Sequence, residues 1–327
     1  MKKNNKTLLE LLAGVIFTSS SIYAVNRIIF YLSQQKDSFI GKHHYTYAHK
    51  QGNIKYTKTG TGSPLLLLHN LDCASSSYEW DEVISTLSKN HTVYALDLIG
   101  CGNSDKPRIT YTSFLYVQTI YDFIKEVICD EVDVIATGNM APIAFLIEHM
   151  HPKTFQHFIF VNPEDFNQTS IMPSAKDTYR KELLEMPIIG TSLYQLYYAK
   201  SALFARFSTK YFGDSNNKKL KYVRRYYAAA HRGGSNCKFL HASLCTHYLG
   251  SNIKSCYKDV NVPTCIIFGK DMHYETDFST WGVFLNPNTE VAIIPDTKFL
   301  PQLEKPGEFT DICDLYLTEG TIEKDLL

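Results

Sequence analysis

The sequence predicts an α/β protein: a doubly wound, mostly parallel sheet with an inserted helical lid and an N-terminal membrane-anchor helix. Short apolar runs such as Leu65–His69 alternate with segments of helical spacing, which is typical of a parallel sheet covered by helices on both faces. This alternation stops between residues 166 and 257, where the chain is rich in tyrosine, leucine and alanine. A third observation is an apolar run that starts at Leu8, directly after three lysines.

The N-terminal run, Leu8 to Val25, is interrupted by Glu10 and a few small polar residues and resumes at Ile28–Leu32. A membrane-spanning helix needs about 20 apolar residues, so residues 1–32 are long enough for a single-pass anchor. A signal peptide cleaved after Ala24 is the alternative. The apolar continuation beyond Ala24 favours an uncleaved anchor. Basic residues flank the run on both sides, so its orientation in the membrane is weakly specified.

The remainder of the chain divides into a tether, a core and a lid. The polar residues 33–49 are predicted as a tether, residues 50–165 and 258–327 as the α/β core, and residues 166–257 as the helical lid. Beyond a first strand and glycine-rich turn after Gly52, strands are expected at Leu65–His69, Thr92–Asp97, Val132–Ala136, His157–Asn162, Pro263–Gly269 and Glu290–Pro295. Helices are expected at Ser76–Lys89, Leu115–Ile128, Ala141–His149 and Gly307–Leu317, with further helices near Tyr194–Tyr211 and Lys219–Ala230 in the lid.

Composition argues against several classes of function. Lysine plus arginine and aspartate plus glutamate both number 33, and no basic stripe stands out, which argues against nucleic-acid binding. The eight cysteines are scattered and form no C-x-x-C pair, so neither a zinc site nor a disulfide framework is indicated. We therefore expect no metal and no cofactor.

Three motifs follow predicted strands. His69-Asn70 follows the first buried strand, the stretch Asp97–Pro107 has the form D-L-x-G-x-G-x-S-x-x-P, and "FLPQLEKPGEF" begins at Phe299 after the last strand. In this order they resemble the α/β-hydrolase fold family, specifically its lidded, epoxide hydrolase- and esterase-like members, from about Gly52 onward. The resemblance implies a nucleophile on the turn after the third strand, an acid after the lid, a histidine after the last strand, and an oxyanion hole of backbone N–H groups.

The residues at the implied catalytic positions do not have catalytic side chains. Counting back from the end of the following helix places Gly138 at the nucleophile, whereas matching its glycine to G-x-S-x-G places Met140 there. Neither residue can attack a substrate, and the nearest hydroxyl, Thr137, lies before the turn in both alignments. Phe299 stands at the position of the histidine. Asp271 is present near the position of the acid, one residue early.

The oxyanion hole is made of backbone and is expected to survive. Its donors are the N–H of Leu71 or Asn70 and that of the residue after the nucleophile, Asn139 when Gly138 holds that position.

Three further residues have side chains capable of chemistry. Cys73, four residues after His69, is either one half of a Cys–His pair or an inert buried thiol. His69 itself is more often structural at such a position, and His273 is either a relocated base or an exposed loop residue.

The sequence therefore predicts a membrane-anchored hydrolase homologue that is catalytically inactive. It is expected to bind a small apolar molecule, or a protein partner, at the former active site. The alternatives are an active, esterase-like hydrolase with an atypical nucleophile and a membrane-tethered scaffold without a ligand. An open cavity above Gly138 favours binding, dense packing of Met140 and Phe299 favours the scaffold, and a contact of Cys73 or Thr137 with a histidine favours the enzyme.

Overall fold

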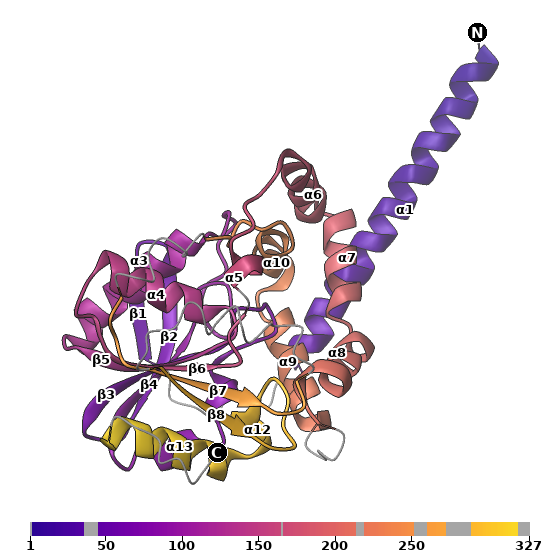
Figure 1. Cartoon of the computed structure of the whole chain (residues 1–327). Helices are drawn as coiled ribbons and strands as arrows, with labels where there is room; N and C mark the ends of the chain where they lie inside the picture. The colour runs from indigo at the N-terminus through magenta and orange to yellow at the C-terminus, as the bar shows by residue number, and fades with distance from the viewer. Residues whose placement is uncertain are drawn as a thin grey trace.

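An eight-stranded sheet forms the centre of the protein, in the order β1-β2-β4-β3-β5-β6-β7-β8 (Figure 1). The computed structural model describes residues 2–35, 45–164, 166–213, 219–251, 260–272 and 289–319. β1 and β2 are antiparallel to their neighbours and the other strands are mutually parallel. The strands are β1 (Tyr45–His49), β2 (Gly52–Thr59), β3 (Ser63–Leu68), β4 (His91–Asp97), β5 (Val132–Thr137), β6 (Phe155–Val161), β7 (Thr264–Gly269) and β8 (Thr289–Ile294). The predicted fold class is confirmed.

The apolar runs form strands that are buried on both faces. In β3, Leu66 and Leu68 pack into one hydrophobic cluster, and Leu65 and Leu67 pack into the cluster on the opposite face. This division follows from the alternation of side chains along a strand. An unbroken leucine run is therefore suited to a central parallel strand that helices cover on both sides.

Helices cover the two faces of this sheet (Figure 1). α3 (Ser113–Phe123) and α4 (Met140–Met150) contribute to the cluster on one face. α2 (Ile84–Leu87) and α13 (Pro306–Glu319) contribute to the other. The stretch Ser76–Lys89 was expected to be one helix, but it divides into the 3-10 turn η1 (Ser77–Trp80) and α2.

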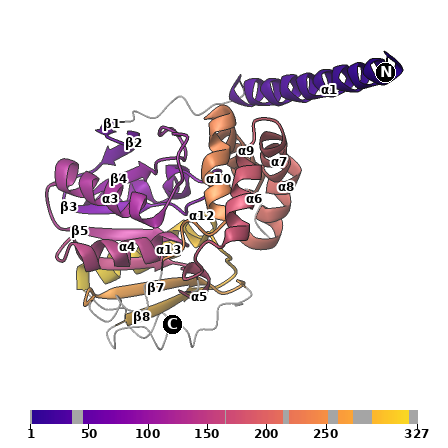
Figure 2. The same cartoon turned by 90° about the horizontal axis from the view of Figure 1, so that it is seen from above.

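The insertion between β6 and β7 contains helices joined by turns and no strand in its described residues, 166–213 and 219–251. Its elements are α5 (Phe166–Thr169), α6 (Ala175–Glu185), α7 (Ile189–Tyr197), α8 (Lys200–Arg206), η3 (Phe207–Tyr211), α9 (Lys219–His231), η4 (Gly234–Asn236) and α10 (Cys237–Cys245). Figure 2 shows α6 to α10 gathered at one side of the sheet. They lie toward the ends at which the parallel strands β5, β6 and β7 finish.

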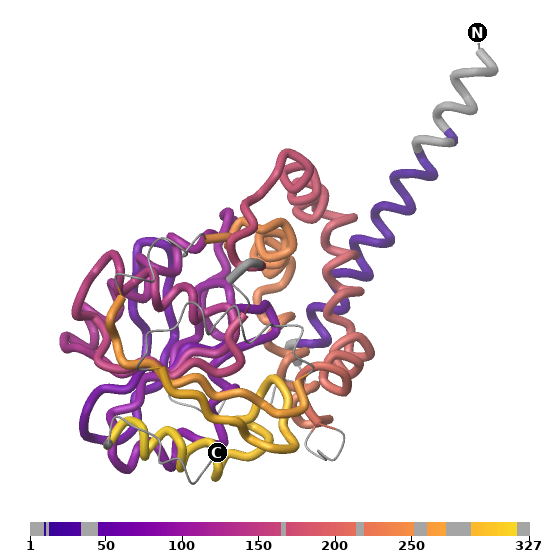
Figure 3. The backbone as a smooth tube through the Cα atoms, in the orientation of Figure 1, coloured from indigo at the N-terminus to yellow at the C-terminus, as the bar shows by residue number. Residues whose placement is uncertain are grey.

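The N-terminal helix α1 (Lys2–Gln35) runs beside the insertion and away from the sheet (Figures 2 and 3). It is long and apolar enough to cross a membrane over Ala13–Ser33. The helix is largely exposed over residues 13–25 and packs against the insertion from Asn26 onward. Asn26 Nδ2 donates a hydrogen bond to Ser192 Oγ at 3.1 Å, and the buried ring of Phe30 lies 5.5 Å from that of His231.

The predicted tether, residues 33–49, was wrong at both ends. Helix α1 continues to Gln35, and Tyr45–His49 forms β1, which pairs with β2. The sequence pattern did not indicate this strand, because only one of its faces is buried and the residues on the other face are exposed. Tyr47 packs its ring against Phe123 at 5.6 Å and donates a hydrogen bond to Glu126 at 2.8 Å. Residues 36–44 lie outside the described residues.

Candidate functional site

The turn between β5 and α4 is centred on Gly138. Gly138 has φ +59, in the left-handed region, and its N–H donates to Val161 O at 2.9 Å. Glycine adopts this conformation without the cost that a Cβ would impose. Asn139 caps the helix, and Met140 is its first residue and fully buried. The sharp turn therefore lies at Gly138, two residues before Met140.

Two side chains fill the space beside Gly138. A Cβ built on Gly138 would lie 2.3 Å from Asn70 Oδ1 and 3.0 Å from Phe299 Cζ. The first distance is far inside van der Waals contact, so a side chain at Gly138 and the present Asn70 rotamer exclude each other. The loop after β3 and the loop after β8 thus meet at this turn.

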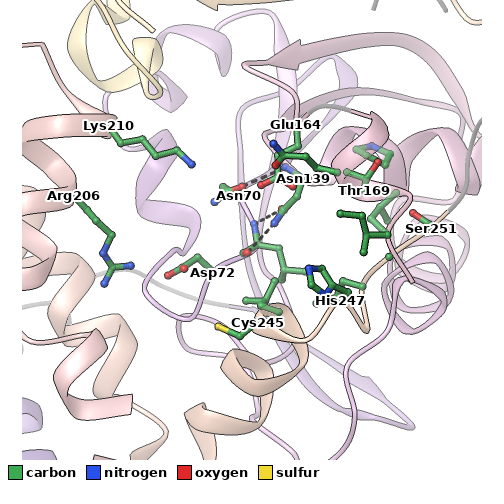
Figure 4. Close-up of a pocket in the computed structure, with 18 of the residues that line it drawn as sticks. Asn70, Asp72, Asn139, Glu164, Thr169, Arg206, Lys210, Cys245, His247 and Ser251 are labelled. Atoms are coloured by element: carbon green, nitrogen blue, oxygen red, sulfur yellow. Dashed lines mark hydrogen bonds between the residues drawn. The ribbon is translucent and has the colours of Figure 1, made fainter. Parts of the chain in front are cut away.

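The two backbone N–H groups expected to form an oxyanion hole already have acceptors (Figure 4). The Leu71 N–H donates to Asn139 Oδ1 at 2.8 Å, and Asn139 Nδ2 donates back to Leu71 O at 3.1 Å. The Asn139 N–H donates to Asn70 Oδ1 at 3.4 Å. The side-chain oxygens of Asn139 and Asn70 therefore occupy the acceptor positions of these two N–H groups.

Glu79 of η1 holds the Asn70 loop in place. Its Oε2 accepts the Asn70 N–H at 2.9 Å, and its Oε1 accepts the Tyr226 hydroxyl of α9 at 2.8 Å. Burial raises the pKa of Glu79 to about 7, and these hydrogen bonds oppose that rise. The carboxyl group connects the core to the insertion directly behind the turn. Sequence analysis missed Glu79; its one signal was an acidic residue next to the apolar Trp80.

Phe299 is 4% exposed and stacks on Tyr211 of the insertion, with ring centroids 5.5 Å apart. Asn162 Nδ2 donates to the carbonyls of Lys298 and Phe299 at 3.0 and 3.1 Å. Glu304 accepts the N–H of Lys298 and that of Gly213, both at 2.7 Å. Glu304 therefore stabilises the loop after β8 and binds it to the insertion. This role does not depend on a histidine at position 299.

Asp271 lies at the surface after β7. Its N–H donates to Thr297 O at 2.8 Å, and its Oδ2 lies 4.0 Å from a Cβ built on Gly213. Within the described part of the chain, Asp271 has no hydrogen bond to a histidine. His273 lies outside the described residues.

The other candidate groups are engaged in the structure of the loops. His69 Nδ1–H donates to Asn70 O at 2.8 Å, and its Nε2 accepts the Leu98 N–H at 3.1 Å. The Cys73 thiol donates to Cys237 O at 3.3 Å, and burial raises its pKa well above the ordinary value. Thr137 Oγ1 accepts a hydrogen bond from Gln302 at 3.4 Å. In these bonds neither Cys73 nor Thr137 pairs with a histidine.

A cavity of about 680 Å³ opens over the turn, between the core and the insertion (Figure 4). We call it the pocket. Its apolar wall comes from both parts of the chain, and its charged groups are Asp72, Glu164, Arg206 and Lys210. The apolar lining residues include Leu71, Pro142, Ile143, Ile171, Leu244 and Leu249. The pocket is therefore open, with a mixed rather than purely apolar lining.

The charges of the pocket are unevenly distributed. Figure 4 shows Arg206 and Lys210 on the side opposite Thr169 and Ser251. The Arg206 guanidinium donates to Tyr197 O at 2.6 Å and lies 4.4 Å from the Tyr197 ring centroid. Burial raises the pKa of Glu164, and the nearby Lys210 opposes that rise.

Cys245 lines the pocket and contacts a histidine, which sequence analysis missed. Its Sγ lies 3.6 Å from Nε2 and 3.7 Å from Nδ1 of His241, one turn earlier on α10. Burial raises the pKa of the Cys245 thiol and lowers the pKa of His241 to about 4. Both groups are thus neutral near pH 7.

Among the described residues, no cluster of three or more His, Cys, Asp or Glu side chains could hold a metal ion.

Curated relatives match parts of the sequence. A 2-hydroxy-6-oxo-6-(2'-aminophenyl)hexa-2,4-dienoic acid hydrolase of Metapseudomonas resinovorans is 36% identical over 72 residues, 22% of this chain and 25% of that protein. A soluble epoxide hydrolase of Corynebacterium sp. (strain C12) is 34% identical over 92 residues, 28% of this chain and 32% of that protein. The matched regions thus span a third or less of these two relatives. A cis-3-alkyl-4-alkyloxetan-2-one decarboxylase of Shewanella oneidensis is 25% identical over 198 residues, 57% of this chain and 57% of that protein. No family model matches the sequence.

Solved structures match nearly the whole chain. A bacterial membrane phospholipase A superposes with a TM-score of 0.65 at 18% identity, covering 97% of this chain and 98% of that one. A thermophilic esterase from Thermogutta terrifontis superposes with a TM-score of 0.67 at 14% identity, covering 85% of this chain and 99% of that one. At these identities the similarity concerns the fold.

Proposed function

Because this chain has the α/β-hydrolase fold, we propose that it is a membrane-anchored, non-catalytic hydrolase homologue that binds a small molecule in the pocket. The observation that carries the proposal is the filled space beside Gly138. In this fold the nucleophile projects from the sharp turn between strand and helix. Here that turn has no side chain, and Asn70 and Phe299 occupy the space into which one would project.

The conformation of the turn supports Gly138 rather than Met140 as the nucleophile position. Met140 lies within α4 and is fully buried, away from the positive-φ residue. Phe299 then stands at the base position, because its Cζ lies 3.0 Å from a Cβ on Gly138. Glycine and phenylalanine can neither attack a substrate nor transfer a proton.

The backbone N–H groups of Leu71 and Asn139 support the loss of catalysis independently, because they already donate hydrogen bonds within the protein. An oxyanion hole stabilises a transition state only when its donors face the position of the developing charge. The N–H groups of Leu71 and Asn139 instead bind the side-chain amides of Asn139 and Asn70. Restoring a nucleophile alone would leave the Leu71 N–H occupied by Asn139 Oδ1.

The pocket supports binding rather than a scaffold role, since it remains open at about 680 Å³. Its lining favours a small molecule with an apolar body and an anionic end. The body would lie against residues such as Leu71 and Ile143, and the anionic end would face Arg206 and Lys210. The helical insertion acts as the lid of this pocket, and α1 is the membrane anchor.

The proposal is tested on the full chain purified in mild detergent. We expect no labelling by a serine-reactive fluorophosphonate and no turnover of activated esters. We expect octanoate, below its micellar concentration, to raise Tm more than octanol or acetate does. Ile143→Trp, which fills the pocket, should remove this shift, whereas Ile143→Leu should keep it. Ester turnover by the wild type, or an octanoate shift that persists in Ile143→Trp, would contradict the proposal.

The contact between Cys245 and His241 favours a second candidate, an esterase-like hydrolase with a cysteine nucleophile. The raised pKa of the thiol opposes it, because the thiolate is the nucleophile. Ester turnover that disappears in Cys245→Ser and persists in Cys129→Ser would establish this candidate. Cys129 is a suitable control because it is exposed and lies outside the pocket.

A further inference from the structure

A second cavity, of about 610 Å³, lies between α1 and the insertion. Tyr23, Arg27 and Tyr31 line it from α1, one helical turn apart. Lys238 of α10 and Arg108 of the core line it from the other side. This cavity is separate from the pocket above Gly138, and no residue lines both.

The position of the cavity along α1 is close to the expected membrane surface. The candidate span Ala13–Ser33 includes Asn26, Phe30 and Ser33, which are buried in the protein and therefore do not face lipid. The apolar run before them, Leu8 to Val25, measures about 27 Å as a helix, close to the thickness of the hydrocarbon core. α1 packs against the insertion from Asn26 onward, so the bilayer surface would fall near Asn26 and Arg27. This step rests on the membrane-anchor part of the proposed function.

The cavity has an excess of positive charge. Its cations are Arg27, Arg108 and Lys238, and its one acidic lining residue, Glu185, is paired with Lys181 at 2.6 Å. Within the described part of the chain, no carboxylate forms an ion pair with any of the three cations. Charge-assisted hydrogen bonds to an anion are therefore available at Arg27 and Arg108.

Lys238 is the most buried of these cations, with 5% of its surface exposed. Its Nζ donates to Met186 O at 2.9 Å and to Thr191 Oγ1 at 3.1 Å. An ammonium group has three N–H donors, so these two bonds leave one for a ligand. Burial lowers the pKa of Lys238, the nearby charge of Arg108 lowers it further, and the charge of Glu185 opposes both effects. An anion placed between Lys238 and Arg108 would add to the effect of Glu185.

Apolar groups extend from the cavity along α1 and the adjacent surface of the insertion. Tyr23 and Ile28 of α1 are exposed, as are Met186, Ile189 and Leu193 at and before α7. Figure 1 shows α7 alongside α1. Tyrosine is enriched at the boundary between headgroups and hydrocarbon, and basic groups at that level attract anionic lipids.

We propose that this second cavity binds the phosphate headgroup of an anionic phospholipid, whose acyl chains extend along α1. Arg27, Arg108 and Lys238 contact the phosphate, and Tyr23 and Tyr31 flank it. Arg27 and Arg108 are exposed, so they can be replaced without opening the core.

The test titrates the full chain in detergent with phosphatidylglycerol and with phosphatidylcholine of the same acyl chains, followed by native mass spectrometry. We expect one tightly bound phosphatidylglycerol per chain. Arg27→Ala/Arg108→Ala should weaken its binding about tenfold or more. The matched control Lys89→Ala/Lys125→Ala removes two exposed cations from the core that do not line the cavity, and its binding should stay unchanged.

Three outcomes would overturn the proposal: equal binding of the two lipids, equal weakening in both double variants, or equally tight binding of inorganic phosphate or glycerol phosphate. The last outcome would identify a site for a soluble phosphate instead.

Flotation with phosphatidylcholine vesicles tests the anchor separately. A chain that floats but shows no preference for the anionic lipid retains the anchor and lacks the site, whereas a chain that does not float contradicts the anchor itself.

Discussion

A serine at Gly138 tests whether Asn70 fills the place of the nucleophile. Gly138→Ser introduces a Cβ at φ +59, which costs about 1–2 kcal/mol in the left-handed region. It also displaces Asn70 Oδ1, at 2.3 Å, and leaves the Asn139 N–H without its acceptor, at a further cost of about 1–3 kcal/mol. We therefore expect the free energy of unfolding to fall by about 2–5 kcal/mol, measured by chemical denaturation of the full chain in detergent.

Gly234→Ser is the matched control. Gly234 has nearly the same backbone, φ +58, but a Cβ there meets nothing within 4 Å. Its variant should lose about 1–2 kcal/mol from the backbone alone. The difference between the two variants measures the crowding at Gly138.

A double-mutant cycle with Asn70→Gly completes the test. Once Asn70 is removed, the serine no longer displaces it, so the double variant should be more stable than the sum of the single effects predicts, by about 1 kcal/mol or more. Strictly additive losses of stability, or equal losses for Gly138→Ser and Gly234→Ser, would refute the reasoning.

The triple variant Asn70→Gly/Gly138→Ser/Phe299→His should gain slow labelling by a fluorophosphonate. Met140→Ser/Phe299→His should not, because Met140 is buried in α4.

Three further results are expected. Phe299→Ala should lower the free energy of unfolding by about 3–5 kcal/mol, and Phe299→Leu should lower it by less. Denaturation midpoints measure both effects. An unchanged midpoint in Phe299→Ala would show that the ring is not packed on Tyr211. Because the pKa of Glu79 is raised in the folded chain, its stabilising contribution is complete below about pH 4.5 and is lost as the pH rises to about 7. Unfolding at a series of pH values should show this loss, up to about 3 kcal/mol, and Glu79→Gln should abolish it; a parallel slope in the variant would contradict the assignment. Deleting residues 1–25 should release the chain from membranes with its Tm retained, whereas deleting residues 1–33 should also lower Tm because Phe30 is lost from the insertion; membrane retention after either deletion would refute the anchor.

The fold could be predicted from the sequence because its signals are local. The run Leu65–Leu68 is apolar on both faces, which is typical of a strand buried on both sides. The strand pattern stops after residue 166, and this change marks the start of the insertion. β1 was missed because Tyr47 buries one ring while its neighbours stay polar, so the alternation resembles a linker.

The site was predictable only in part. Gly138 and Phe299 could be placed by motif, because the loops around them retain their framing residues. The role of Asn70 could not, since it depends on Oδ1 of one loop reaching the N–H of another across 69 residues. Glu79 escaped for the same reason, because it connects the core to the insertion. Cys245 and the cations Arg206 and Lys210 lie within the insertion, and only the fold shows that they line the pocket.

The seating of α1 on the insertion has a mechanical consequence. Asn26 and Phe30 fix the helix to α7 and α9. The same insertion is joined to the core at many points, among them the Glu79–Tyr226 and Glu304–Gly213 hydrogen bonds and the ion pairs Arg225–Asp81 and Lys221–Glu82. With α1 embedded in a bilayer, the insertion becomes the stationary body, fixed to the plane of the lipid. Because the core is bonded to the insertion at so many points, the two would stay together as one body, and the open pocket would keep a fixed height above the lipid surface.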